Sequence, residues 1–394
     1  MKKKEENGKM MKKIICFLFL LVAAFSLCTE AHAETVGASH PDYSSSSELA
    51  EQSGAASLPD KLPEETKKML QGLGVDGSNW SSVTSITPQN YFQKILSVFS
   101  GQLKHPLRVF ASAVSIILLC ALISGMKLSF GEKPLGGVVG TVGTLCMCAV
   151  IIQPIVSCIS DAAEVLKASS AFLLACVPVL TAVMAAAGQA VTAGSYHILM
   201  MAAGNAISLF ASTFLVPMMN IFLALSVVSS VSPGIHLNGF CSVLNKIVKW
   251  IMGLGMTLFT GLVTTHSLVA ASQDSTTAKA AKFVVGSFVP VVGSALGEAL
   301  NTVSGCVKML KSGIGAFGLL AGLLIFLPVL AECMLWIITL MLCSGISQVF
   351  ELDGITGLLK AASDVVSTML SILLCCMTVL IISTVVMLLI GGAT

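Results

Sequence analysis

The amino-acid sequence predicts an all-α fold: a polytopic transmembrane helix bundle with Gly- and Pro-broken helices, preceded by a signal peptide and a short polar external segment. Composition predicts the membrane class, because 55% of the 394 residues are hydrophobic, only 11% are charged and the mean hydropathy is +0.91. Soluble domains carry about 25% charged residues. The charged residues are concentrated near the N-terminus, because 22 of the 42 Lys, Arg, Asp and Glu residues lie within residues 1–105. This distribution places the polar segment before the membrane domain.

Residues 1–33 have the three parts of a signal peptide. Six lysines precede an apolar run at residues 14–27, and Ala31 and Ala33 supply the small residues of a cleavage site before Glu34. Cys28 raises the alternative of a lipoprotein, but Leu27 stands where a lipoprotein signal has a small residue. We therefore expect cleavage after Ala33 and a mature N-terminus outside the cell.

Residues 34–104 are expected to form a polar external segment. Its first part is rich in serine and acids and has too little apolar content to fold, which is typical of a linker. A short helix is expected at residues 63–70, because Pro63 and two glutamates begin it and two lysines end it. A second helix at residues 88–103 carries an apolar face and is expected to lie on the membrane surface or on a partner. Its apolar residues are Tyr91, Phe92, Ile95, Leu96, Phe99 and Leu103.

Residues 105–394 are expected to form the membrane domain. A span needs about 20 apolar residues, and the candidates are residues 107–126, 135–159, 168–189, 195–231, 250–271, 313–350 and 365–390. The runs 195–231 and 313–350 are too long for one crossing, so each is expected to form two helices or a bent hairpin. The expected count is seven to ten segments. With the N-terminus outside, the 127–133 loop falls in the cytoplasm and a loop at Asp161, Glu164 and Lys167 falls outside.

Candidate functional residues cluster around two membrane prolines. The run 279–311 has lysines at both ends and contains Pro290, Gly293, Gly297 and the acid Glu298. Proline removes a backbone donor, so we expect a broken or re-entrant helix inside the bundle. Glu332 follows Pro328 in the same way.

Glu298 and Glu332 are the two strongest candidates for functional membrane residues, because an ionised side chain at the bilayer centre costs about 2.5–3.5 kcal/mol. A polar path, a proton site or a partner contact would justify this cost. Alternatively, both lie near an interface, with Glu298 facing Lys308 or Lys311, or both are protonated.

Four prolines recur in an apolar setting at positions 178, 217, 290 and 328, with separations of 39, 73 and 38 residues. Two pairs of nearly equal spacing favour two related halves with broken helices at matching places, as in transporters. Chance recurrence in so apolar a chain explains the spacing equally well.

The sequence contains none of the motifs of common enzymes. It lacks H-E-x-x-H, G-x-x-x-x-G-K-[ST], G-x-S-x-G and C-x-x-C, and its six histidines are scattered singly. We therefore expect no enzymatic activity, no metal and no cofactor, and we interpret most of the 13 cysteines as small buried hydrophobes. The net charge of +2 provides no basic surface for nucleic acid.

The block from Lys279 to Lys311 resembles the stage III sporulation protein AE family of endospore-forming bacteria. The resemblance is carried by Lys279 to Phe283, Gly286-Ser-Phe-Val-Pro-Val-Val-Gly293, Glu298-Ala-Leu-Asn-Thr-Val303, and Lys308 to Lys311. It implies a multi-pass protein of the mother-cell membrane around the forespore, with its mature N-terminal segment outside. It also implies a part in a channel or secretion-like complex needed for late forespore development and sigma-factor activity.

The partners that the resemblance implies are the other stage III sporulation A proteins, including a secretion-type ATPase and ring-forming members, and the forespore protein Q across the intermembrane space. The lipid bilayer is the remaining partner. A self-sufficient secondary transporter for a small solute, with Glu298 or Glu332 as its coupling site, is the alternative. Hydropathy alone does not distinguish the two.

Overall fold

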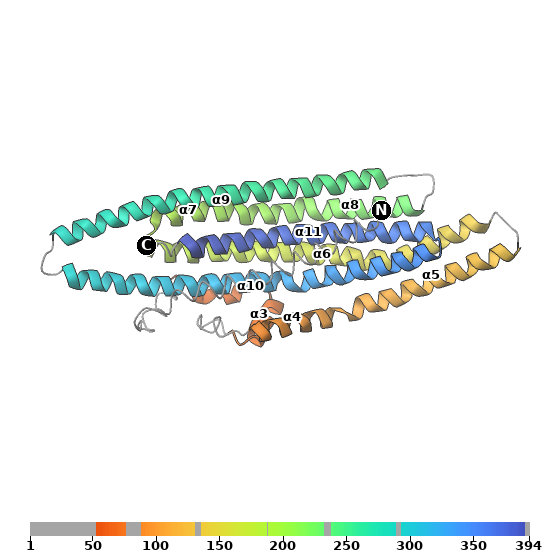
Figure 1. Cartoon of the computed structure of the whole chain (residues 1–394), viewed down its shortest axis with the longest axis horizontal. Coiled ribbons are helices and arrows are strands. Elements are labelled where there is room, and N and C mark those ends of the chain that lie inside the picture. The colour runs from red at the N-terminus through yellow and green to blue at the C-terminus, as the bar shows by residue number, and fades with distance from the viewer. Residues whose placement is uncertain are drawn as a thin grey trace.

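The computed structural model describes residues 53–75, 88–130, 135–186, 188–231, 238–288 and 293–390, and within these residues the fold is all-helical, without strands. The signal peptide with Ala31 and Ala33, and Pro290, lie outside the described residues. Long helices run lengthwise through an elongated bundle, and most reverse the direction of the helix before them (Figure 1). The predicted all-α class is confirmed.

The elements follow one another with short connections. They are the 3-10 turns η1 (Ala55–Ser57) and η2 (Pro59–Lys61), the helices α3 (Glu64–Gly72), α4 (Pro88–Gln102), α5 (Lys104–Phe130), α6 (Leu135–Ala186) and α7 (Ala190–Leu209), the π-helical turn η4 (Phe210–Leu215), and the helices α8 (Val216–Val231), α9 (Asn238–Phe288), α10 (Gly293–Val349) and α11 (Asp353–Ile390).

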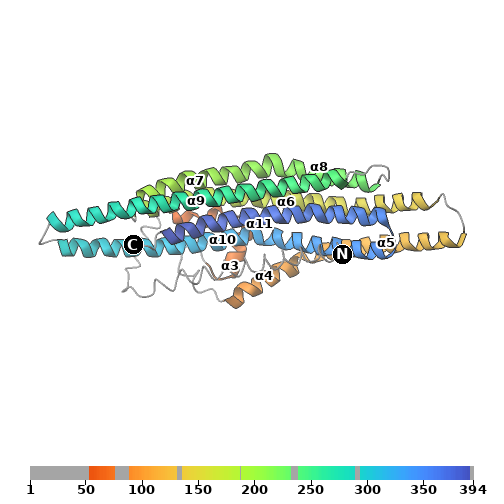
Figure 2. The same ribbon diagram turned by 45° about the horizontal axis from the view of Figure 1, so that its top comes forward.

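Helix α10 forms the centre of the bundle. Nearly all its side chains between Ile314 and Ala331 are buried, including the large rings of Phe317 and Phe326. Helices α6 and α11 both pack against it, and Figure 2 shows α11 running alongside it. Because lipid is as apolar as these side chains, close packing stabilises the bundle rather than simple transfer out of water.

Glycines let α10 and α11 approach each other closely. A Cβ added at Gly322 would overlap the side chain of Leu380, whereas one at Gly345 would meet nothing within 4 Å. Gly318 and Gly322 are four residues apart, a spacing that permits close helix packing. At Gly322 the structure shows such a close approach to α11.

We expect Gly322→Val to lower the free energy of unfolding by about 1–3 kcal/mol, because the added branches must displace Leu380. Thermal unfolding of the purified protein in detergent measures this. Gly345→Val is the matched control on the same helix, since it makes the same change in helix propensity in open space. Equal melting temperatures for the two variants would contradict the close α10–α11 packing.

The helices are much longer than a bilayer is thick. α6, α9 and α10 contain 52, 51 and 57 residues, which is about 75–85 Å at 1.5 Å per residue, against about 30 Å of hydrocarbon. Six helices within the described residues are long and apolar enough to cross a membrane. Only part of each of the longest helices therefore lies in hydrocarbon at one time.

Two sequence-based expectations about connections differ from the structure. Asp161, Glu164 and Lys167 do not form a loop but lie inside α6, so the expected spans 135–159 and 168–189 belong to one helix. The run 313–350 is not a hairpin, because α10 continues through it and through Pro328 without a break. A single proline loses one backbone hydrogen bond, and packing on all sides of α10 holds the helix together despite that loss.

The run 195–231 also stays helical, as α7, η4 and α8 in succession. The π-helical turn ends at Leu215, two residues before Pro217. Such wider turns accommodate an extra residue, and they commonly occur where the normal hydrogen-bond ladder is disturbed.

The N-terminal segment packs against the bundle. The predicted helices at 63–70 and 88–103 are confirmed as α3 and α4. Leu58 and Leu70 are buried, and α3 and α4 both contact α10. On α4, Ile95 and Phe99 pack against the core, whereas Leu96 is 61% exposed. The segment is therefore a structured cap on one side of the bundle.

Candidate functional site

A cluster of polar side chains lies where α5, α6 and α10 meet. Glu332 and Trp336 stand one turn apart on α10, and the indole Nε1–H of Trp336 donates a hydrogen bond to Glu332 Oε1 at 3.2 Å. His105, at the start of α5, meets the Trp336 ring edge to face, with ring centroids 5.6 Å apart. Trp336 is fully buried, so its indole links the two polar side chains through the interior.

Helix α6 contributes the second carboxyl group. Asp161 is half-buried, and Ser157 Oγ lies 3.5 Å from Asp161 Oδ2, at the outer limit of a hydrogen bond. Asp161 and His105 both act electrostatically on Glu332. Two carboxyl groups and an imidazole therefore share one region of the bundle.

Two thiols fix the register of α6 against α10 at this level. Cys158 Sγ lies 3.5 Å from Cys333 Sγ, and both side chains are buried. Each cysteine is close in sequence to one carboxyl group of the cluster, Asp161 or Glu332. The sequence-based interpretation of these cysteines as small buried hydrophobes agrees with their burial.

The position of Pro328 adds a further polar group. Proline has no N–H, so the carbonyl of Leu324 receives no hydrogen bond from position 328. Glu332 follows one turn later on the same continuous helix. The two carboxyl groups and the imidazole can bind a proton or a polar group of a partner.

No group of three or more His, Cys, Asp or Glu side chains is close enough to hold a metal ion within the described residues. The groups of the cluster can exchange protons and form hydrogen bonds.

The structure separates the two glutamates that the sequence singled out. Gly293, Gly297 and Glu298 lie in the first two turns of α10. Glu298 precedes Glu332 by 34 residues on this helix. At 1.5 Å per residue, the two backbone positions are about 50 Å apart. Glu298 and Glu332 therefore cannot serve one site within a chain.

Sequence reasoning missed His105, Asp161 and Trp336. Asp161 was assigned to a loop, and His105 was counted among scattered histidines. Three polar residues spaced three apart, Asp161, Glu164 and Lys167, are also compatible with one side of a helix. That spacing was the available signal.

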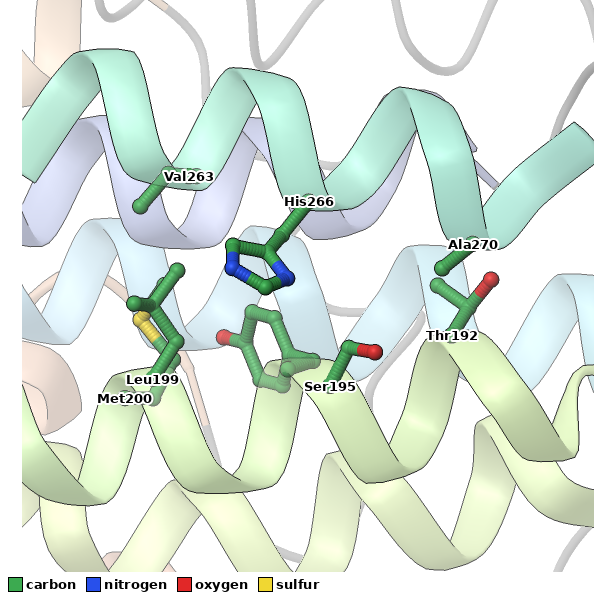
Figure 3. A pocket seen from close by; sticks show the side chains of 8 residues that line it. Thr192, Ser195, Leu199, Met200, Val263, His266 and Ala270 are labelled. Carbon is green, nitrogen blue, oxygen red and sulfur yellow. The ribbon is translucent and has the colours of Figure 1, made fainter.

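A second polar contact lies between α7 and α9 around a cavity of about 10 Å³, room for one water molecule. His266 of α9 and Tyr196 of α7 both line this cavity, and Figure 3 shows His266 pointing toward α7, where Ser195 lies. Tyr196 Oη donates to the backbone carbonyl of Ser383 at 3.4 Å. Hydrogen bonds between packed helices explain these residues without a ligand.

The bundle and its internal polar cluster define a polytopic α-helical membrane protein. The sequence profile of the family described as "Stage III sporulation protein AE" matches residues 79–391. The chain therefore belongs to the stage III sporulation protein AE family, as the resemblance indicated.

One relative is the Stage III sporulation protein AE of Bacillus subtilis (strain 168). It is 23% identical over 299 residues, which cover 74% of this chain and 72% of the relative. No solved structure matches the chain.

Proposed function

We propose that this chain is a membrane component of the channel or secretion-like complex that links mother cell and forespore during sporulation. Family membership carries the proposal, because the matched residues 79–391 include every helix from α4 to α11. A role in sporulation follows from the family itself. Membership of the complex and its location in the cell are the proposed part.

The location that we propose is the mother-cell membrane around the forespore, with the N-terminal segment in the intermembrane space. The partners are the other stage III sporulation A proteins, including a secretion-type ATPase and ring-forming members, and the forespore protein Q. The absence of a nucleotide-binding motif from the sequence supports a separate ATPase. The cap formed by α3 and its neighbours offers a folded surface for contacts on that side.

Within this function, we assign the cluster around Glu332 the role of a polar site inside the bundle. Its groups come from three helices, so a change of protonation or of bound partner there would act on α5, α6 and α10 together. This is how a local charge change gains a wider effect on a helix bundle.

The proposal is tested by deleting the gene in its host and imaging a late forespore-specific reporter through sporulation. We expect normal growth and engulfment, followed by reporter failure and forespore collapse, and rescue by the intact gene. Unaffected sporulation with a nutrient-dependent growth defect would instead favour the self-sufficient transporter.

A further inference from the structure

Helix α11 carries a polar stripe on a helix that is otherwise apolar enough to span a membrane. The stripe consists of Asp353, Gly357, Lys360, Asp364, Ser367 and Ser371. Successive members are three or four residues apart, which places all of them on one side of an α-helix. Here polar residues recur with the period that usually marks an apolar face.

The stripe passes from an open surface into the contact with α9. Asp353, Gly357, Lys360 and Asp364 are exposed, whereas Ser367 and Ser371 are half-buried. Helix α9 packs on α11 at this level, because Thr368 Oγ1, next to Ser367 in the sequence, donates a hydrogen bond to Asn245 Oδ1 at 2.9 Å. The stripe thus begins at the turn between α10 and α11 and continues inward between α11 and α9.

The stripe lies at the same level of the bundle as the apolar span of α5. A Cβ at Gly143 of α6 would meet both Cys120 of α5 and Ile355 of α11, so these two residues share one level of the bundle. At that level α5 exposes Leu119 and Leu122, by 61% and 65%. Because α5 and α11 run in opposite directions (Figure 1), the stripe covers the same levels of the bundle as the apolar span Lys104–Met126.

The exposed leucines of α5 suit contact with lipid at this level, whereas the exposed charged side chains of the stripe do not. Charged side chains at bilayer depth cost about 2.5–3.5 kcal/mol each on insertion scales. Within the described residues, Asp353 and Lys360 form no ion pair that would reduce this cost. They need water or an equivalent polar cover.

We propose that the polar stripe of α11 is one wall of a water-filled passage, which opens at the turn between α10 and α11 and leads toward the seam between α11 and α9. The inference rests on the proposed function, since a channel component needs a polar route at bilayer depth. Charges of both signs and serine hydroxyls suit small polar or ionic solutes.

Hydroxyl groups of two helices lie along the stripe. On α11, Ser371 Oγ–H donates to the carbonyl of Ser367 at 2.8 Å. Ser230 of α8 borders the stripe, because its Oγ lies 3.8 Å from a Cβ built at Gly357. A hydroxyl group of α8 therefore lies next to the stripe at Gly357.

The test is chemical accessibility at bilayer depth. Gly357→Cys fits the structure, because the nearest atom to its Cβ is at ordinary contact distance. Leu119→Cys is the matched variant on the apolar side, and native Cys146, exposed on α6, is an internal standard. Open membrane fragments, which expose both surfaces, are treated with a charged methanethiosulfonate reagent, and peptide mass spectrometry follows each site.

We expect position 357 to react at least about tenfold faster than position 119 and Cys146, because the reagent and the reactive thiolate both require water. A Ser367→Cys variant should react at an intermediate rate, since it lies deeper. Reaction at position 357 as slow as at position 119 would overturn the passage.

The same labelling in membranes from sporulating cells separates water from a protein cover. Continued reaction at position 357 supports a passage in the assembled complex, and protection there would mean that a partner covers the stripe and that the passage is wrong. Slow reaction at position 357 in open membranes, or protection there in sporulating membranes, would contradict the passage alone. The proposed function is tested independently by the deletion phenotype.

Discussion

Glu332→Gln is expected to reduce the late forespore reporter roughly ten- to hundredfold while leaving the amount of protein in the membrane unchanged. The carboxamide has the same size and still accepts the hydrogen bond from Trp336 Nε1. It can neither carry a charge nor exchange a proton, and a hydrogen bond to a charged group is worth about 1.5–3 kcal/mol. Reporter fluorescence and quantitative blotting of membranes measure the two quantities.

Glu164→Gln is the matched control, because Glu164 is an exposed carboxyl of α6 close in sequence to Asp161. It should sporulate like the unmodified chain. Full reporter activity in the Glu332→Gln strain would remove the functional role of the cluster and leave Glu332 as a packing residue.

Trp336→Ala is expected to lower the free energy of unfolding by about 3–5 kcal/mol, the range for removing a large aromatic side chain from a core. The side chain is fully buried, contacts His105 and donates to Glu332, so its loss leaves a cavity and an unpaired carboxyl oxygen. Thermal unfolding in detergent measures the effect.

Trp250→Ala removes the same side chain from an exposed position on α9, where Trp250 is 68% exposed. Its effect should stay within about 0.5 kcal/mol. If Trp250→Ala destabilised the protein as much as Trp336→Ala, the centre of the bundle would not be where α5, α6 and α10 meet.

The fold class and the short N-terminal helices could be predicted because they depend on local signals. Composition alone indicates a helical membrane protein, and Pro63 with its neighbouring charges is enough to start α3. Helix continuity could not be predicted in the same way. Asp161, Glu164 and Lys167 are typical of a short loop, yet in α6 they remain helical, with Glu164 and Lys167 exposed.

The site could be predicted only in part. Glu332 and Pro328 stand out because an acid after a proline is rare in an apolar run. His105 and Asp161 reach Glu332 through the packing of α5 and α6 on α10, and nothing in the local sequence encodes that proximity. The stripe on α11 has a clear helical period, but the apolar residues around it dominate any average over the segment.

The measurement that tests the account most directly is purification of the tagged chain from engulfed cells in mild detergent, followed by mass spectrometry of what accompanies it. We expect the other stage III sporulation A proteins and the forespore protein Q to co-purify with it, and we expect the isolated chain to move no solute in liposomes. A chain that purifies alone and transports a small solute by itself would contradict the proposed role in a complex.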